Sequence, residues 1–381
     1  MHILHLVKTS ETALWVYNMM KGIKESHPEI SFSVMLPFGG KYQHKYEDVC
    51  RDIYDFDFKI DRKLFNRGSN FRNIVLQDNP DIIHSWYTQT TLYARLFLRN
   101  SSIPRLFEVI GPLHLEFFMY RWFDILSAQK NDYWKATSKR TLYLYQKFGV
   151  KNEKLFFSYL PNNVDELLSK MKESSPLNLR EENNIPDNFK IIGTASIMYP
   201  PKLFKKNGVK NHEMLLEVFG KLLAIREDVV LVIGGTTLGN DKSYEHKIKA
   251  LASKIRPDKI IFTGWVENLG RLITEFDVFV FLSYSENLGG VYESLLYQVP
   301  TVASDRGGIP ELVIDGHTGF TCNLKSIDEI VNKINLLLDD ADLKEKFKTN
   351  GLKQVRQTFN KQESLNIAYE TYVKLFQQDH K

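Results

Sequence analysis

The sequence has little cysteine and no long apolar run. Its two cysteines, Cys50 and Cys322, lie far apart in the chain, and no CxxC or Cys/His cluster is present. A disulfide framework and a zinc site are therefore not indicated, and a reducing, cytoplasmic setting fits this cysteine usage best. No apolar stretch approaches the about 18 residues that a membrane-spanning helix needs.

The N-terminus lacks the features of a signal peptide. No basic residue precedes its apolar stretch and no small-residue cleavage site follows it, so residues 2–7 are expected to form a first strand. The turn after them reads KTSETA, without GxGxxG, and no such fingerprint follows any later strand. An NAD or FAD enzyme is therefore not indicated.

A strong charge of either sign is absent as well. The formal net charge is +4 over 381 residues, which is too small to indicate nucleic-acid binding. The excess lies in residues 1–170, which contain 23 Lys and Arg against 18 Asp and Glu. The same region holds an aromatic run, Phe117, Phe118, Tyr120, Trp122 and Phe123. Basic charge with aromatics indicates an anionic partner or a lipid headgroup surface, although a solvated face over a core helix would have the same composition.

Strand-like and helix-like runs alternate along the chain. The strand-like runs are residues 2–7, 31–37, 80–86 and 104–111, and then 190–197, 229–235, 259–265, 277–283 and 300–305. Such alternation predicts parallel sheets covered on both faces by helices. The polar, proline-containing stretch between the two groups of strands interrupts the rhythm.

This pattern predicts an α/β protein with two Rossmann-like, doubly wound domains that face a cleft. We expect an N-terminal domain at 1–165, a linker at 166–188 and a C-terminal domain at 189–360. The final helix, within 361–381, is expected to pack back on the N-terminal domain. In doubly wound sheets, ligands bind beyond the carboxyl ends of the strands.

Residues 283–319 form the most informative segment. A strand ends at Ser283, a loop with Glu286 follows, and Gly289 and Gly290 then open a helix that carries Glu293. Glycines let a ligand approach the backbone, and free N–H groups at a helix N-terminus attract phosphate. One carboxylate would accept sugar hydroxyls and the other ribose hydroxyls. A nucleoside diphosphate sugar requires all of these features together.

This segment resembles the donor site of the retaining, GT-B-fold glycosyltransferases of family 4, in group 1. Ser283, Glu286, Glu293 and Pro300 match the family pattern, as do Gly307, Gly308 and Glu311 at the second glycine pair. The loop between the two acids is one residue shorter than usual. The resemblance implies that Glu286 positions the transferred sugar and that Glu293 and the segment Asn287, Leu288, Gly289 and Gly290 bind the donor.

The resemblance continues on either side of this segment. Lys210 stands at the position of the family's diphosphate-binding lysine, and Lys202 stands near the place of its usual arginine. Gly264 lies in a strand-end turn like those around the nucleotide base. His114 is the histidine nearest to the position of a family histidine that contacts the sugar. We expect Gly111–Pro112 to turn it into the cleft, although a structural histidine is the alternative.

A second motif has a different association. Asp55–Phe56–Asp57 forms a DxD, which holds a metal ion and a diphosphate in another glycosyltransferase fold. It lies in the wrong half of the chain and lacks the long apolar strand expected before it. We therefore expect no metal site and no cofactor, with positive side chains and helix N-termini carrying the diphosphate charge.

The resemblance implies transfer of a hexose-type sugar from a UDP- or GDP-sugar to a saccharide or lipid-linked acceptor. It also suggests a role in surface polysaccharide biosynthesis, in the cytoplasm, with a peripheral contact at the inner face of the membrane. Two alternatives stay open. One is a catalytically silent GT-B protein that binds a glycan or partner, and the other is a nucleotide-sugar epimerase of the same fold.

Overall fold

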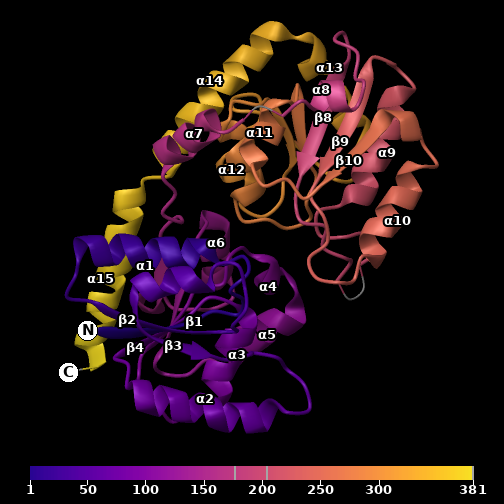
Figure 1. The fold of residues 1–381 in the computed structure, drawn as a ribbon. Helices are drawn as coiled ribbons and strands as arrows, with labels where there is room; N and C mark the ends of the chain where they lie inside the picture. The colour runs from indigo at the N-terminus through magenta and orange to yellow at the C-terminus, as the bar shows by residue number, and fades with distance from the viewer. Residues whose placement is uncertain (176, 203–204, 380–381) are drawn as a thin grey trace. The chain divides into compact units, whose positions relative to one another are not determined.

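The computed structural model describes residues 1–175, 177–202 and 205–379. Position 176 of the predicted linker and positions 380–381 of the predicted C-terminal segment lie outside the described residues. The chain forms two compact units, Met1–Asn162 with Phe359–Lys381, and Asn163–Thr358. Each unit is a parallel sheet with helices packed on it (Figure 1), so the predicted α/β class with two Rossmann-like domains is confirmed. The cleft between them stays a prediction.

The sheet of the first unit has seven strands in the order β3-β2-β1-β4-β5-β6-β7, and every pair is parallel. The reversal of strand order beside β1 is the feature of a doubly wound sheet. The strands are β1 His2–Leu6, β2 Ser31–Leu36, β3 Cys50–Asp55, β4 Ile82–Ser85, β5 Arg105–Phe107, β6 Asp132–Ala136 and β7 Leu155–Phe157.

Helices cover both faces of this sheet because each strand buries side chains on both sides. One core packs the apolar stripe of α1 with that of α15, and the other packs α2, α3 and α6. The helices are α1 Leu14–Ser26, α2 Leu64–Asp78, α3 Thr88–Phe97, α4 Leu113–Glu116, α5 Phe118–Leu126, α6 Lys139–Lys147 and α15 Lys361–Asp379. Short 3₁₀ turns occupy Gln43–Asp48 and Asn152–Lys154.

Helix α15 packs on the N-terminal unit, although it lies at the C-terminal end of the chain. It lies against α1 and β4 (Figure 1) and buries Leu365, Ala368 and Leu375 in the same core as α1. The hydroxyl of Tyr372 lies 2.7 Å from Nδ1 of His84 in β4, and both residues are buried. This polar contact fixes the register of the helix on the sheet, because a slip would leave a buried nitrogen unpaired.

The sheet of the second unit has six parallel strands in the order β10-β9-β8-β11-β12-β13. The strands are β8 Lys190–Ala195, β9 Val229–Gly234, β10 Ile260–Gly264, β11 Val278–Phe281, β12 Thr301–Ser304 and β13 Phe320–Cys322. The order reverses between β8 and β11, and the loops that follow these two strands meet at the carboxyl edge of the sheet.

The helices of the second unit include two short ones in the predicted linker. The helices of this unit are α7 Val164–Glu173, α8 Leu179–Glu182, α9 His212–Leu223, α10 Ser243–Ala252, α11 Leu269–Thr274, α12 Gly289–Leu296, α13 Ile327–Asp339 and α14 Ala341–Thr358, and the first two are the linker helices. Short 3₁₀ turns occupy Pro257–Lys259 and Ile309–Glu311. Residues 166–188 group with the second unit, because Leu179 and Ile185 are buried and Arg271 donates to the carbonyl of Lys172 at 2.8 Å.

Four strands were not predicted: β3, β6, β7 and β13. β6 reads DYWKA, and its Asp132 and Lys135 are buried in ion pairs with Arg105 (2.6 Å) and Glu108 (2.9 Å). These partners lie 27 residues away along the chain. Because the sequence does not show this pairing, the charged residues make a fully buried strand read as a polar segment. β3, β7 and β13 end the two sheets, where short or half-exposed strands have a weak pattern.

Candidate active site

The loop after β11 is fastened to its neighbours on both sides. The carbonyl of Val209 accepts bonds from Ser283 Oγ at 3.0 Å and from the backbone N–H of Tyr284 at 2.9 Å. Ser304 Oγ at the end of β12 donates to the carbonyl of Ser283 at 2.6 Å. Together these bonds join the loops of three neighbouring strands at one edge of the sheet, so the position of Glu286 is fixed by three segments.

Lys210 and Glu286 form an ion pair across two of these loops. Asn211, with φ of 57°, takes the left-handed conformation that begins α9, and Val209 on the other side is held by the β11 loop. Both charged side chains keep about an eighth of their surface exposed, 14% for Lys210 and 13% for Glu286. The sequence assigned these two residues to one donor, and the structure brings them together.

The second glycine pair, Gly307 and Gly308, contacts the backbone of Glu286. Gly307 has φ of 58°, and a Cβ there would overlap the carbonyl oxygen of Glu286. The N–H of Gly308 donates to that same oxygen at 3.0 Å. The motif at 307–308 therefore positions the backbone of the acidic loop, whereas the sequence alone indicated close approach of a ligand.

The start of α12 presents an uncapped helix N-terminus. Leu288 is its N-cap residue and no side chain caps it, so the first N–H groups of the helix lack intrahelical acceptors. A Cβ on Gly289 would meet only open space, whereas one on Gly290 would overlap the ring of Phe281. Gly290 is thus explained by packing, and Gly289 leaves room beside the helix terminus. The neighbouring Asn287 is buried, and its Oδ1 has no hydrogen-bond partner among the described residues.

Glu293 lies one turn into α12 and is partly buried, with no hydrogen bond to its carboxyl group among the residues described. Burial, together with the negative charge of Glu286, raises the pKa of Glu293 to about 7. A carboxyl group without a protein donor at the edge of the sheet is suited to accept hydroxyl groups from a ligand.

Gly264 and Lys202 occupy the rim of the same sheet. Gly264 has φ of 67°, and its carbonyl accepts the N–H of Gly235 at 2.8 Å, so the ends of β9 and β10 are joined. Gly235 in turn packs on the carbonyl of Ser196 after β8, where a Cβ would not fit. Lys202 is exposed in the loop between β8 and α9, and the structure does not bring it to Glu286 by any described contact.

Three further polar groups lie at this edge that the sequence analysis missed. Ser285 Oγ and Thr237 Oγ1 are buried without a hydrogen-bond partner among the described residues. Burial and the charge of Glu286 raise the pKa of the Tyr199 hydroxyl. Hydroxyl residues after strands are common in loops, so the sequence pattern alone does not distinguish these three.

His114 belongs to the first unit and lines a pocket there, and the expectation that it points into the cleft stays a prediction. It is 5% exposed, in the short helix α4, and both ring nitrogens are engaged. Nδ1 lies 3.1 Å from the carbonyl of Gly111 and Nε2 lies 2.9 Å from the hydroxyl of Tyr145. Nε2 is also 3.5 Å from Asp124. This geometry favours the structural alternative, because Gly111, with φ of 83°, folds its carbonyl onto the ring.

The DxD residues bind neighbouring protein groups. Asp55 Oδ1 accepts the N–H of Phe38 at 3.0 Å, and Asp57 pairs with Lys59 at 2.6 Å. Within 1–175, 177–202 and 205–379, no group of three His, Cys, Asp or Glu residues is arranged to hold a metal ion.

Comparisons with known proteins find relatives among glycosyltransferases. Residues 178–354 match the family described as "Glycosyl transferases group 1". The chain is 22% identical to the "Capsular polysaccharide biosynthesis glycosyltransferase CapM" of Staphylococcus aureus, over 98% of this chain and 97% of the relative. It is 21% identical to the "UDP-Gal:alpha-D-GlcNAc-diphosphoundecaprenol alpha-1,3-galactosyltransferase" of Escherichia coli, over 71% of this chain and 69% of the relative.

A solved structure shares the fold. The crystal structure of Anabaena Alr3699/HepE in complex with UDP-glucose has a TM-score of 0.79 and 17% identity, covering 98% of this chain and all of that one. The fold is therefore that of the GT-B glycosyltransferases.

The raised pKa of Glu293 makes a prediction about stability. Because the folded pKa of about 7 exceeds the ordinary 4.5, the stabilising contribution is complete below pH 4.5 and is lost as the pH rises through 7. Glu293→Gln removes this loss. We expect its unfolding free energy, relative to the unsubstituted protein, to rise by about 1–3 kcal/mol between pH 4.5 and 8.

Urea unfolding of both proteins at pH 4.5 and pH 8 measures this difference, from the transition in which the second unit unfolds. Glu217→Gln, at an exposed position of α9, is the matched control and is expected to show no such change. A Glu293→Gln difference that stays constant with pH would show that the carboxyl group is not destabilised by its surroundings.

Proposed function

We propose that this chain, whose residues 178–354 match the group 1 glycosyl transferases, transfers a hexose-type sugar, with retention of anomeric configuration, from a UDP- or GDP-sugar to a saccharide or lipid-linked acceptor. The proposal depends on one observation: Lys210, Glu286 and Glu293 lie together beside the uncapped N-terminus of α12. The capsular polysaccharide and diphosphoundecaprenol relatives support a role in surface polysaccharide biosynthesis, and the UDP-glucose complex supports the donor class.

The diphosphate would bind where the positive groups converge. The ammonium of Lys210 and the first N–H groups of α12 both favour an anion at the carboxyl edge of the sheet. The donor's phosphate would compete with Glu286 for Lys210, which releases the Glu286 carboxylate to accept sugar hydroxyls. Lys202, exposed in the neighbouring loop, would supply a second positive charge. In this proposal these groups carry the diphosphate charge without a metal ion.

The remaining groups would orient the two ends of the donor. Glu293, without a hydrogen bond to a described residue, would accept ribose hydroxyls, and Asn287, whose Oδ1 is unpaired, would bind a hydroxyl of the sugar or an amide of the base. Gly264, whose added Cβ would meet only open space, leaves room for the base beside the end of β10. In this proposal the segment Leu288–Gly290 binds the part of the donor between these two ends, with its backbone N–H groups facing the phosphates.

The chemical step would proceed on the face of the sugar from which the diphosphate leaves. The C–O bond to the phosphate breaks while the acceptor oxygen forms the new bond on the same face, and the departing phosphate oxygen takes the acceptor's proton. Stabilisation of the leaving diphosphate by Lys210 lowers the barrier, since charge develops there in the transition state. His114 would help only by shaping the acceptor side, because its ring nitrogens are engaged.

Substitution of the ion pair tests the site. We expect Lys210→Ala and Glu286→Gln each to lower kcat/KM about 10²–10³-fold, since each removes one charged contact to the transition state. Initial rates with UDP- and GDP-sugars measure this, and thermal shift with each nucleotide identifies the donor. Lys206→Ala, an exposed lysine of the same loop, is the control and is expected to retain full activity. Undiminished transfer by Lys210→Ala would reject the site.

Retention has its own test. From an α-linked donor we expect an α-linked product, since bond formation and cleavage share one face of the sugar. The anomeric proton coupling and carbon shift of the isolated product, followed from the first turnovers by NMR, report the linkage. A β-linked product from the same donor would replace the retaining mechanism with a direct displacement.

We also propose a peripheral contact with the cytoplasmic face of a membrane, through α5. No helix within the described part of the chain is long and apolar enough to cross a bilayer. Over its nine residues, however, α5 exposes six large apolar side chains, at 49–67% of their surface. They are Phe118, Met119, Tyr120, Trp122, Phe123 and Leu126. A helix with such a face is typical of an interfacial contact.

Vesicle binding tests this contact. We expect Trp122→Ser to weaken co-sedimentation with phosphatidylglycerol vesicles roughly tenfold, because one large aromatic side chain no longer enters the lipid. Phe65→Ser, at an equally apolar but isolated position on α2 that is 78% exposed, is expected to bind like the unsubstituted protein. Equal loss in both variants would contradict a contact through α5.

A further inference from the structure

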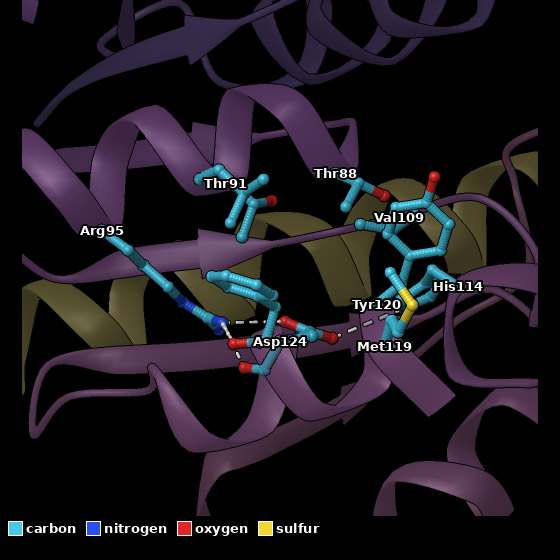
Figure 2. Close-up of a pocket in the computed structure, with 10 residues that line it drawn as sticks. Thr88, Thr91, Arg95, Val109, His114, Met119, Tyr120 and Asp124 are labelled. Atoms are coloured by element: carbon cyan, nitrogen blue, oxygen red, sulfur yellow. Dashed lines mark hydrogen bonds and ion pairs between the residues drawn. The ribbon is translucent and has the colours of Figure 1, made fainter. Parts of the chain in front are cut away.

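A pocket of about 160 Å³ opens between α3 and α5 in the first unit. Thr91 and Leu92 of α3 line one side, Val109 follows β5, and α5 closes the other side with Met119, Tyr120 and Phe123 (Figure 2). α3 follows β4 and α4–α5 follow β5, so the pocket lies among helices that cover one face of the sheet, and Val109 brings it next to the carboxyl end of β5.

The charged residues at the floor of the pocket bind each other. Arg95 pairs with Asp124 at 3.0 Å and with Asp132 at 3.2 Å, and its guanidinium lies over the ring of Phe107 at 4.5 Å. Asp124 also accepts the indole N–H of Trp134 at 3.3 Å. Figure 2 shows Arg95 reaching from α3 to Asp124 below the pocket.

The polar atoms of this floor do not reach the space above it. Arg95 Nε and Nη2 and Asp124 Oδ2 are buried out of contact with water. Thr91 Oγ1 is engaged with Ser85 Oγ at 3.0 Å. The walls therefore offer carbon to a ligand and no vacant charge, and whatever enters this pocket must be apolar in the part that enters.

The mouth of the pocket is continuous with the exposed face of α5. Met119, Tyr120 and Phe123 line the pocket and are each about half exposed, and Phe118 and Trp122 extend the same apolar surface beyond it. An apolar cavity inside a monomer is usually closed, whereas this one opens into an apolar surface. The two features together form one path for a hydrocarbon chain from a lipid surface into the protein.

The segment that contains α5 and α6 has more basic than acidic side chains at its surface. Between residues 113 and 147 there are six Lys and Arg against three Asp and Glu. Asp124, Asp132 and Lys135 are buried in ion pairs, which leaves five basic residues and Glu116 at the surface, and Glu116 lies 4.0 Å from Arg140. Arg121, Lys139, Arg140 and Lys147 are partly or fully exposed on α5 and α6. This charge is complementary to an anionic headgroup held next to an apolar chain.

We infer that the pocket between α3 and α5 binds the hydrocarbon segment adjacent to the anionic headgroup of a lipid-linked acceptor. Its volume is comparable with the about 150 Å³ of an apolar cavity that holds benzene, so it takes a segment of about five or six carbons. The acceptor role of this lipid depends on the proposed function, but the binding itself does not. The hydrocarbon would hold the acceptor at the N-terminal unit while its sugar end stays free to react.

A pair of matched substitutions on α3 tests the site. Leu92 lines the pocket, whereas Leu96, one turn further along, is 55% exposed outside it. Leu92→Trp fills the space, and we expect it to weaken binding of decyl phosphate by about tenfold in calorimetry, because the chain loses its apolar burial. Leu96→Trp is expected to bind decyl phosphate like the unsubstituted protein. Val109→Phe is a second filling variant in case Leu92→Trp does not fold.

Two further probes distinguish the contribution of the headgroup to binding from that of the hydrocarbon chain. We expect inorganic phosphate to bind at least about tenfold more weakly than decyl phosphate, since it lacks the chain, and decyl maltoside to bind more weakly because it lacks the charge. Unchanged decyl phosphate binding in both filling variants would overturn the pocket assignment. Equal affinity for decyl maltoside would overturn the anionic-headgroup part.

A measurement of nucleotide binding distinguishes failure of this inference from failure of the proposed function. UDP binding to the second unit, followed by thermal shift, is expected to be the same in Leu92→Trp and in the unsubstituted protein. Loss of decyl phosphate binding with UDP binding retained supports the inference. Decyl phosphate bound normally by a protein that binds no nucleotide would remove the transferase proposal and leave the lipid site in place.

Discussion

The carbonyl of Val209 joins the two loops of the second unit that carry Lys210 and Glu286. It accepts two hydrogen bonds from the loop after β11, and this joins the segment that carries Lys210 to the segment that carries Glu286. Gly307 and Gly308 fix the backbone of Glu286 from the other side. Two opposite charges on separate loops are thereby kept in contact, with most of their surface shielded from water. Shielding strengthens their interaction, and it would do the same for a diphosphate that replaced Glu286 as the partner of Lys210.

The first unit uses buried charge in a different way. His84, Glu108 and Lys135 form one buried group on the face covered by α15, and Arg95, Arg105, Asp124 and Asp132 form another below α5. Burial alone would raise the pKa of Glu108, but the charges of Lys135 and His84 outweigh it and keep the pKa below its usual value. Such networks are costly to form and strongly destabilising to break on one side, so they favour a single arrangement of the helices. They place α15 and α5 without offering a free catalytic group.

Much of the architecture followed from the sequence. Alternating apolar runs predicted both parallel sheets, and the spacing of Glu286, Gly289–Gly290 and Glu293 predicted a strand, a loop and a helix N-terminus in that order. Lys210 and Glu286 were assigned to one site although 75 residues lie between them. This was possible because both residues stand at positions of the family pattern that the sequence resembles, and not because the strand order was known. Strands β6 and β13 were missed, one because its charges pair across the chain and the other because it is a short edge strand.

The sequence by itself determined most of the central strands and the helices between them, because apolar periodicity and glycine positions act over a few residues. It also determined the donor-site motif, because that motif lies within one continuous stretch. Only the tertiary structure decided that His114 is engaged by Gly111 and Tyr145, that Gly307 supports Glu286, and that a pocket opens under α5. Each of these depends on partners from distant parts of the chain, and whether a polar group is free for a ligand or already bound is settled by packing rather than by its neighbours in sequence.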